Sequence, residues 1–288
     1  MSITITAPDS LDDATAEGIH ALVARCNAAE RLDLPISPEV GASASLLLAH
    51  IDGDLAGVAQ VGHGPESEIC LCVDPARRRR GAGRALVTAA RGHVAARGAG
   101  DILLVSDTTA ESGPAFAESL GAQLSFAEHR MDLDLAAVPA APVPMPDLDI
   151  RPAHGGDAPA IAAVLVAAFG DPPAMVERFV AERIVSRSHR FLLGELVGRP
   201  AGTLRLIVDD GWTYVSTFGV LPALHGRGVG RRMLLHTIGL LLADGQRAVR
   251  IEVDTTNASA IGLYESCGFR RGRTFAYHRL PELAPSAS

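Results

Sequence analysis

Hydrophobic and polar positions along this chain form blocks that predict short strands and amphipathic helices in one recurring order. In the second half, a short strand and two helices precede a run of three strands, and a strand, a helix and a last strand follow the next helix. The predicted strands cover residues 148–151, 190–195, 202–208, 212–220, 248–253 and 273–280, and the predicted helices cover residues 157–169, 173–184, 230–243 and 258–266. Hairpin-joined strands followed by strand–helix–strand–helix–strand indicate a mixed α/β sheet.

The first half of the chain repeats this order. At an offset of 147 residues (228 − 81), Gly81 aligns with Gly228 and Gly121 with Gly268, together with an Asp-Thr-Thr and a Glu-Ser-x-Gly segment. No gap is needed across this stretch. A period of domain size indicates two copies of one fold, not a solenoid.

A proline-rich segment, Ala136–Pro146, separates the two copies. Its four prolines exclude a helix interior and favour an extended, semi-rigid spacer. We therefore expect a domain over residues 1–135, a linker over 136–146, and a second domain over 147–288.

Composition narrows the class of protein. The 288 residues are 48% hydrophobic, which is enough for two packed cores, and the formal net charge of −7 disfavours a broad nucleic-acid-binding surface. No apolar run approaches the roughly 20 residues of a membrane span, and the N-terminus has no signal-peptide pattern. Four scattered cysteines give neither a disulfide framework nor a four-ligand zinc site. We expect a cytoplasmic protein without a metal and without nucleic-acid or membrane partners; the oligomeric state stays open.

A glycine-containing loop joins a strand to a helix in each copy. The first loop reads Arg78-Arg-Arg-Gly81-Ala-Gly83, and the second reads His225-Gly-Arg-Gly228-Val-Gly230. Glycines let the backbone curl and expose N–H groups, and a helix N-terminus adds a positive dipole. Such a junction is typical of a pyrophosphate cradle, and the alternative is a plain tight turn that opens a helix. The chain contains no lysine, which excludes a P-loop, and Leu86 or Met233 stands where a dinucleotide fingerprint requires its third glycine.

Both loops resemble the Q/R-x-x-G-x-G/A signature of the GCN5-related N-acetyltransferase (GNAT) superfamily, with His225 in place of Gln or Arg in the second copy. The segment Asn257–Phe269 also resembles the N-x-x-A-x-x-L-Y-x-x-x-G-F signature of that family. The resemblance implies two tandem GNAT domains, each a mixed, mostly antiparallel sheet flanked by helices. It also implies acetyl-CoA as a substrate and an amine acceptor.

The resemblance further implies the residues that bind acetyl-CoA. The pantetheine arm would lie between two splayed strands and pair with the main chain of the second copy, where Asn257 would hydrogen-bond the arm or a water. The implied cofactor-binding residues are Phe218, Gly219, Val220, His225, Gly226, Arg227, Gly228, Val229, Gly230, Arg231 and Asn257, with Val73, Arg78, Arg79, Arg80, Gly81, Ala82, Gly83 and Arg84 in the first copy.

The two copies differ at the positions that the chemistry needs. Tyr264 would point its hydroxyl at the CoA sulfur and serve as general acid, whereas its counterpart is Ala117, and Ala110 stands opposite Asn257. We therefore expect catalysis in the second copy and a degenerate first copy that is structural or binds CoA without turnover. Two alternatives remain: Tyr264 fills the core as an ordinary aromatic residue, or the protein binds CoA in a regulatory or scaffold role.

The general base is less defined than the acid. No carboxylate lies within the strand before the second loop, so Asp210 or Glu252 would act through water, and Asp254 is the weaker candidate because the first copy retains its counterpart. A tandem GNAT with one degenerate half resembles the mycothiol synthase group, which acetylates a cysteinyl amine. That group has a Glu six residues before the valine that ends the strand, where this chain has Tyr214.

Other candidate residues are better explained by phosphate contacts, packing or surface exposure than by a separate function. The run Arg77–Arg80 fits phosphate contacts better than a nucleic-acid patch, which would need interleaved aromatic residues. Cys70 and Cys72 have the spacing of one strand face and are predicted to be buried apolar residues, not a metal pair. His236 is predicted to pack or to lie at the surface.

Overall fold

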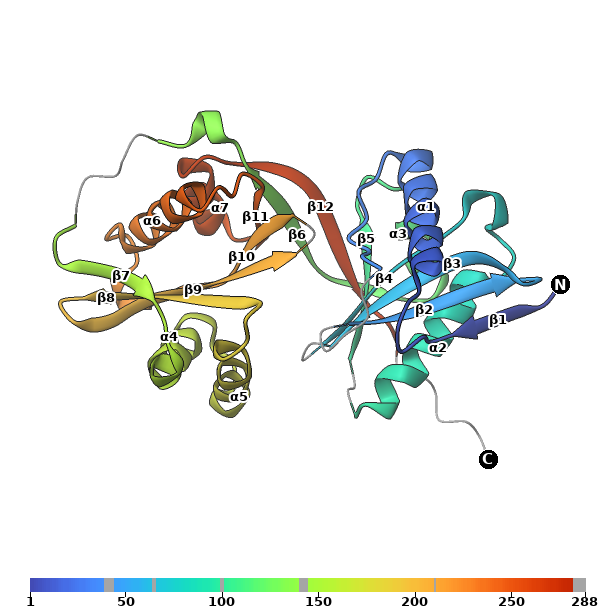
Figure 1. The fold of residues 1–288 in the computed structure, drawn as a ribbon, viewed down its shortest axis with the longest axis horizontal. Coiled ribbons are helices and arrows are strands. Elements are labelled where there is room, and N and C mark those ends of the chain that lie inside the picture. The colour runs from blue at the N-terminus through green and yellow to red at the C-terminus, as the bar shows by residue number, and fades with distance from the viewer. Residues whose placement is uncertain (39–43, 64–65, 99–100, 140–144, 210, 282–288) are drawn as a thin grey trace. The chain divides into compact units, whose positions relative to one another are not determined.

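The computed structural model of the protein describes residues 1–38, 44–63, 66–98, 101–139, 145–209 and 211–281. Contacts divide the chain into two compact units. Unit 1 contains Met1–Glu128 and the residues from Arg273 onward, and unit 2 contains His129–Gly272. Each unit has a sheet with helices on both faces, which confirms the predicted α/β class (Figure 1).

The elements of unit 1 surround a sheet in the order β1-β2-β3-β4-β5, followed by the last part of β12. β4 and β5 are parallel, and the other described pairs of this sheet are antiparallel. The bounds are β1 (Ile3–Thr6), α1 (Asp13–Glu30), β2 (Ala44–Ile51), β3 (Asp54–Gly62), β4 (Ser67–Val73), α2 (Ala82–Ala96), β5 (Ile102–Asp107), α3 (Ser112–Ser119) and β6 (Gln123–Leu133).

Unit 2 repeats this plan with the order β6-β11-β10-β9-β8-β7, in which β10 and β11 are parallel. The bounds are β7 (Leu148–Pro152), α4 (Ala158–Phe169), α5 (Pro173–Ile184), β8 (His189–Leu196), β9 (Arg199–Asp209), β10 (Trp212–Val220), α6 (Val229–Ala243), β11 (Val249–Asp254), α7 (Ala258–Ser266) and β12 (Phe269–Arg279). These elements match the predicted ones to within a few residues, except that β12 begins four residues earlier than predicted.

The compact units do not follow the sequence repeat at the last strand of each copy. β6 passes from unit 1 to unit 2 after Glu128, and β12 passes from unit 2 to unit 1 after Gly272. The last part of β12 pairs with β5 from Phe275↔Asp107 to Arg279↔Leu103. The division into domains at residues 135 and 147 therefore stays a prediction about the repeat and does not describe these units.

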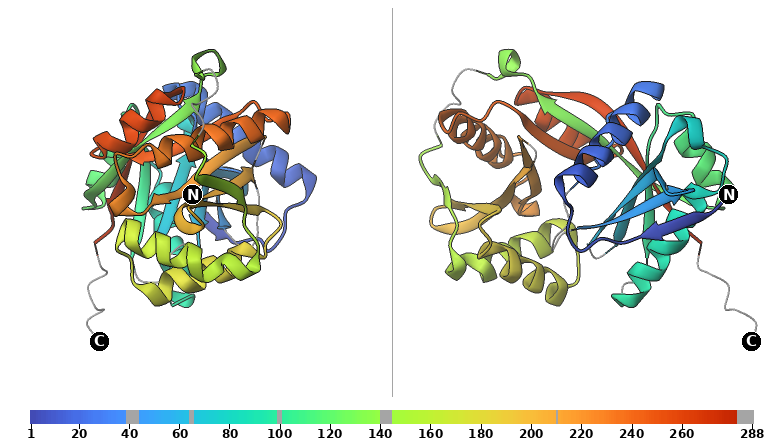
Figure 2. Two further views of the ribbon diagram at one scale, coloured as in Figure 1. Left: turned by 90° about the vertical axis from the view of Figure 1, so that its left-hand side faces the viewer. Right: turned by 45° about the vertical axis from the view of Figure 1, so that its right-hand side comes forward.

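Alternating residues on the strands bury opposite faces against different helices, because side chains of a strand point alternately to its two sides. In unit 2, Phe191 and Leu193 face α4 and α5, whereas Leu192, Leu204 and Leu206 face α6 and α7. Figure 2 shows α4 and α5 together on one side of this sheet and α6 on the other. In unit 1, α1 and α2 divide the two faces in the same way.

Local sequence explains where several elements end. Asp52 and Gly53 both have positive φ, 51° and 92°, which is the backbone of a tight hairpin turn between β2 and β3. Gly170, with φ of 78°, ends α4 in the left-handed conformation that glycine favours. None of the helices in the described part of the chain is long and apolar enough to cross a bilayer.

The predicted extended linker begins with a helical turn. Ala136 and Ala137 belong to a 3-10 helix, Leu135–Ala137, because the Asp134 carboxylate accepts a hydrogen bond from the Ala136 amide at 3.0 Å. Residues 140–144 of the linker lie outside the described residues.

Candidate active site

The two glycine loops have the same backbone plan. A 3-10 turn follows the strand in each unit, and Gly81 and Gly228 then stand at the N-termini of α2 and α6 with φ of 92° and 81°. Neither helix has a side chain that caps its first N–H groups. Uncapped N–H groups and the positive end of the helix dipole together favour an anion at each junction.

Equivalent side chains brace both loops. Arg78 Nε donates to the Val73 carbonyl at 3.2 Å, and the ring nitrogen Nε2 of His225 lies 2.9 Å from the equivalent Val220 carbonyl. His225 therefore reproduces the contact of the arginine that it replaces. One residue further along, Arg79 adopts φ of 63°, the left-handed region that glycine favours.

The second glycine of each loop allows two helices to approach. A Cβ on Gly83 would lie 3.1 Å from the Phe116 ring, and a Cβ on Gly230 would lie 3.3 Å from Leu263. The following arginine fastens the same pair of helices, since Arg231 donates to the Ser266 carbonyl at 2.8 Å and Arg84 makes the equivalent contact in unit 1. Arg84 and Arg231 are among the residues expected to bind acetyl-CoA, but in the structure their guanidinium groups hydrogen-bond to the neighbouring helix.

The strands on either side of each loop helix diverge. β4 and β5 pair only as far as Cys70↔Val105, and β10 and β11 pair only as far as Val215↔Ile251. In unit 1 this divergence opens a cavity of about 530 Å³. Its walls come from the ends of both strands, the glycine loop, α3 and the end of α1.

A β-bulge distinguishes unit 2 from unit 1. The pairing of β10 with β9 shifts between Ser216 and Gly219, and Thr217 there has φ of 50°. β-branched residues rarely adopt this conformation, and strained backbone of this kind concentrates at functional sites. The equivalent stretch of β4 pairs with β3 without a shift. The bulge could not be predicted from the sequence, because neither Ser216 nor Thr217 is a residue that marks one.

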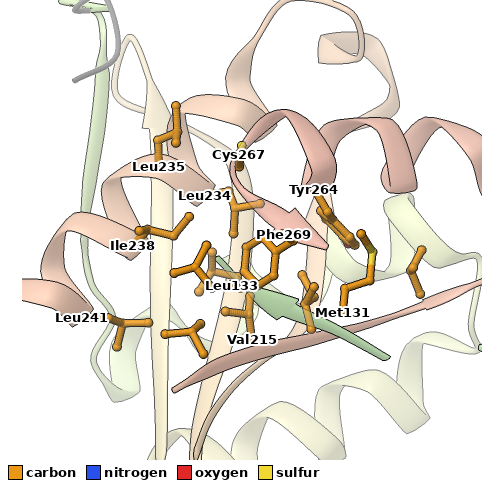
Figure 3. Packing of buried hydrophobic residues seen from close by; sticks show 14 of the residues in the cluster. Met131, Leu133, Val215, Leu234, Leu235, Ile238, Leu241, Tyr264, Cys267 and Phe269 are labelled. Carbon is orange, nitrogen blue, oxygen red and sulfur yellow. The ribbon is translucent and has the colours of Figure 1, made fainter. Parts of the chain in front are cut away.

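Tyr264 lies on α7 beside the bulged segment. Its side chain is 7% exposed, and its ring stacks near that of Phe218, with centroids 6.3 Å apart and planes inclined by 21°. Figure 3 shows Tyr264 next to Phe269 and Met131 in the core between α7 and the sheet. Burial raises the pKa of the phenol to about 12. The hydroxyl is therefore protonated at neutral pH, as a proton donor must be.

Asn257 serves as the N-cap of α7. Its Oδ1 accepts a hydrogen bond from the Ala260 amide at 3.0 Å, which leaves the amide NH₂ available to another acceptor. The counterpart in unit 1, Ala110, has no polar group to cap α3. Glu30, at the end of α1, supplies the capping acceptor instead. Its carboxylate accepts hydrogen bonds from Ser112 N, Ser112 Oγ and Glu111 N.

Glu30 also forms an ion pair with Arg78 and so connects α1, the first glycine loop and α3. Burial opposes ionisation of Glu30, but the hydrogen bonds from Ser112 and the ion pair outweigh it and hold the pKa below the usual value. No sequence pattern indicates this contact, because it joins residues far apart in the chain.

We expect Glu30→Gln to lower the free energy of unfolding by about 1–3 kcal/mol, because it removes a charged acceptor of several partly buried donors. A lowered pKa contributes stability above the ordinary carboxyl pKa and loses it as the pH falls through the folded value. The difference from the wild type, measured by thermal unfolding, should therefore shrink below about pH 4. Asp54→Asn is the control, since Asp54 pairs with Arg77 but is 71% exposed. An equal loss in both variants would contradict the connecting role of Glu30.

Of the two candidate general bases, Glu252 lies within the described residues and Asp210 does not. Glu252 is exposed on β11, one residue beyond the last paired rung with β10. Asp254 accepts hydrogen bonds from Thr256 N and Oγ1, and Asp107 holds Thr109 in the same way. That shared turn supports a structural role for Asp254.

A carboxylate with a shifted pKa lies in unit 1 instead. The side chain of Glu68 on β4 is exposed, yet the surrounding protein and the carboxylates of Glu128 and Glu66 raise its pKa to about 7. Unit 1 therefore holds a carboxyl group with a raised pKa but has Ala117 in the place of the tyrosine.

The remaining candidate residues lie in the core, at the surface or in a surface ion pair. Cys70 and Cys72 are buried against α1, and His236 is exposed. Arg77 pairs with Asp54 at 2.8 Å. Within the described residues, no three His, Cys, Asp or Glu side chains gather as a metal site would require.

Known families match both halves of the chain. The profile of the acetyltransferase (GNAT) family matches residues 161–269, and that of an acetyltransferase (GNAT) domain matches residues 42–121. A mycothiol acetyltransferase of Clavibacter sepedonicus is 32% identical over 92% of this chain and 90% of its own length. A mycothiol acetyltransferase of Thermomonospora curvata is 33% identical over 90% of this chain and 93% of its own length.

Solved structures share the fold along the whole chain. A GCN5-related N-acetyltransferase from Sphaerobacter thermophilus has a TM-score of 0.79 and 23% identity, and covers 99% of this chain and 98% of its own. A tandem GNAT protein from the clavulanic acid biosynthesis pathway has a TM-score of 0.73 and 19% identity, over 99% of this chain and all of its own. The predicted resemblance and the predicted tandem fold are thus confirmed. The chain belongs to the GNAT family of N-acetyltransferases, with one copy of the GNAT fold in each half.

Proposed function

We propose that unit 2 transfers the acetyl group of acetyl-CoA directly to a primary amine, with Tyr264 as general acid. The observation that carries this proposal is the buried side chain of Tyr264, whose ring stacks near Phe218 in the bulged end of β10. Unit 1 has a buried alanine, Ala117, at the equivalent position, and its β4 pairs with β3 without a shift.

Acetyl-CoA would lie along the divergent edge of β10. β10 pairs with β11 only at Thr213–Val215, so the main chain of Phe218–Val220 has an edge without a strand partner toward β11. Pantetheine amides would pair with this edge, and the diphosphate would meet the N–H groups of residues 226–231. Asn257 would offer its free NH₂ to the arm. Acetyl-CoA is a substrate here, and the proposal requires no metal.

The chemistry then needs three proton transfers. An alkylammonium with a pKa near 10.4 must first lose a proton, at a cost of about 4–5 kcal/mol at pH 7. Glu252 would accept that proton through water. The amine nitrogen then attacks the thioester carbon, the carbon–sulfur bond breaks, and Tyr264 gives its proton to the departing sulfur. The attacking nitrogen then loses its second proton, which returns to the phenolate through solvent, and the base releases the first proton to solvent. The products are an acetamide and CoA.

Unit 1 would bind CoA without turnover. Arg79 and Arg80 have no ion-pair partner among the described residues, so both guanidinium groups remain available for phosphates beside Gly81. The cavity of about 530 Å³ next to this loop is of the size that small-molecule sites have. Ala117 leaves it without a proton donor.

The test is release of CoA thiol from acetyl-CoA with a panel of primary amines, followed by mass analysis of the acetylated product. Time-dependent acetylation of at least one amine, well above the rate without enzyme, is expected. If acetyl-CoA binds but no amine in the panel stimulates thiol release, the alternative of a non-catalytic CoA-binding protein replaces this proposal.

A second candidate concerns the acceptor. The relatives named mycothiol acetyltransferase favour a cysteinyl amine of the mycothiol type. The side chain at the start of β10 differs from the glutamate expected for that group, and the hydroxyl of Tyr214 lies 3.3 Å from Arg250 Nη1. A cysteinyl amine therefore belongs in the panel as one acceptor among others.

A further inference from the structure

A buried arginine in unit 2 lacks a negative partner. Arg205 on β9 is 9% exposed, and its Nη2 donates to Ser216 Oγ at 3.1 Å. Its Nε is buried without a hydrogen-bond partner, and no carboxylate among the described residues pairs with it. A guanidinium carries five donors, and a buried charge without compensation is costly, so this side chain needs an explanation.

The neighbours of Arg205 add positive charge. Arg183 on α5 lies over the Phe179 ring with its Cζ 4.2 Å from the centroid, and Arg205 Cζ lies 5.0 Å from the same centroid. Burial and the nearby Arg183 lower the pKa of Arg205 to about 10. His189 on β8 has a buried Nδ1 without a partner, and burial, Arg205 and Arg183 lower its pKa. We call Phe179, Arg183, His189 and Arg205 the Arg205 cluster.

The fold neutralises a comparable arginine nearby. Arg250 on β11 is 5% exposed, but its Nε donates to the Asp132 carboxylate at 2.7 Å, and it stacks 3.7 Å from the Trp212 ring centroid. A cation–π contact alone does not cancel a charge. Arg205 has such a contact but no carboxylate partner among the residues that the structure describes, and so differs from an arginine held only for structure.

The cluster is specific to unit 2. Arg205 pairs with Ser216 across β9 and β10, one rung beyond Val215, and the equivalent rung of unit 1 is Gln60↔Cys70. Gln60 is uncharged, and its Oε1 accepts a hydrogen bond from the Ser37 amide at 2.9 Å. The sheet therefore does not require an arginine at this rung.

The cluster lies close to the bulge of β10. Ser216, which accepts the hydrogen bond of Arg205, is the last residue before the bulge, and Phe218 within the bulge stacks near Tyr264. The cluster lies on the α4–α5 face of the sheet, whereas Tyr264 packs on the α6–α7 face. An acceptor that contacts both would pass through the gap where β10 and β11 separate after Val215↔Ile251.

We infer that the Arg205 cluster binds an anionic group, a carboxylate or a phosphate, on the amine acceptor of unit 2. The guanidinium of Arg205 supplies donors to the anion, Arg183 adds positive potential, and His189 adds a further ring nitrogen. The assignment to the acceptor rests on the proposed function, whereas binding of an anion at Arg205 does not. An anion site at Arg205 predicts a higher kcat/KM for amines that carry an anionic group, such as short amino acids or aminoalkyl phosphates, than for neutral amines.

The kinetic test uses amines that differ only in the charged group: β-alanine against β-alaninamide, and phosphoethanolamine against ethanolamine. In the wild type, kcat/KM should favour the anionic member of at least one pair by tenfold or more. Arg205→Met should remove that preference, mainly through KM, and Arg205→Lys should retain part of it. Arg190→Met is the matched control, because Arg190 is an exposed arginine on the adjacent strand β8 that pairs with Asp244.

The binding test does not depend on turnover. With CoA saturating, the anionic member of the favoured pair should raise the Tm of the wild type and of Arg190→Met, and should not raise that of Arg205→Met. If no amine is acetylated but this shift is seen, the proposed function fails and the anion site stands.

Three results would overturn the inference. One is equal kcat/KM for the anionic and neutral amines in the wild type, including a preference for a neutral cysteinyl amide. Another is a preference that survives in Arg205→Met. The third concerns the acyl donor. If Arg205→Met lowers kcat/KM for succinyl-CoA but leaves the preference for the charged amine unchanged, the anion at Arg205 belongs to the acyl group and not to the acceptor.

Discussion

Tyr264→Phe should lower kcat by about 10²–10⁴-fold and leave the affinity for acetyl-CoA nearly unchanged. The substitution keeps the ring that packs against Phe218 and Phe269 and removes only the hydroxyl. A phenol with a pKa of about 12 is a weak acid beside a thiol of about 8.5 in water. The same burial that raises the pKa of Tyr264 also raises that of a thiolate leaving within the site, which narrows the mismatch.

Steady-state kinetics with the best amine, and calorimetry of CoA binding, check this prediction. Because the pKa is raised, the hydroxyl stays protonated at every pH well below 12, so any loss of kcat between pH 8 and 10 must come from another group. Tyr277→Phe in unit 1 is the control for removal of a buried tyrosine hydroxyl elsewhere. Turnover of Tyr264→Phe within a few-fold of the wild type would remove Tyr264 as the acid.

Gly228→Val should abolish turnover, whereas Gly81→Val should leave kcat within a few-fold of the wild type. Both glycines start a helix at positive φ, 81° and 92°, so valine strains both loops by about 1–3 kcal/mol and the backbone costs are matched. What differs is the chemistry behind each loop: Tyr264 follows the second, and Ala117 follows the first. A side chain at Gly228 would also stand where the diphosphate has to approach the N–H groups of α6.

Paired measurements separate binding from chemistry. A ligand that binds only the folded state stabilises it by about 2.7 kcal/mol at a hundredfold excess over Kd. Gly81→Val should therefore lose part of the rise in Tm that CoA gives, and Gly228→Val should lose CoA binding in unit 2, as calorimetry would show. Loss of activity in a folded Gly81→Val protein would mean that unit 1 contributes to the active site.

Most of the local structure could be predicted from the sequence. The period of apolar residues located the helices and strands, and the 147-residue offset located the two copies (228 − 81). The glycine loops were also recognisable, because positive φ at Gly81 and Gly228 is a local requirement that few other residues meet. Arg79 shows the limit of that reasoning, since an arginine takes the same left-handed conformation as Gly226.

Parts of the candidate site were beyond sequence reasoning. The bulge at Ser216–Gly219 arises from how β10 pairs with β9, and Thr217 is not a residue that marks it. Glu30 reaches Ser112 across 82 positions of the chain, and no pattern along the sequence links the two. In the sequence, Arg205 occupies an ordinary alternating position of a strand. Only the structure shows that it is buried without a carboxylate partner among the described residues.

The repeat, the order of elements, the two glycine loops and the difference between Tyr264 and Ala117 follow from the chain alone, since each is a property of a short segment or of a fixed offset. The tertiary structure alone decided that β6 and β12 each contribute to both compact units. The two last strands have similar alternating patterns, and pairing between strands depends on backbone hydrogen bonds that any residue except proline can make. It also decided which charges are neutralised: Arg250 finds Asp132 across 118 positions, and Arg205 finds no carboxylate in the described part of the chain.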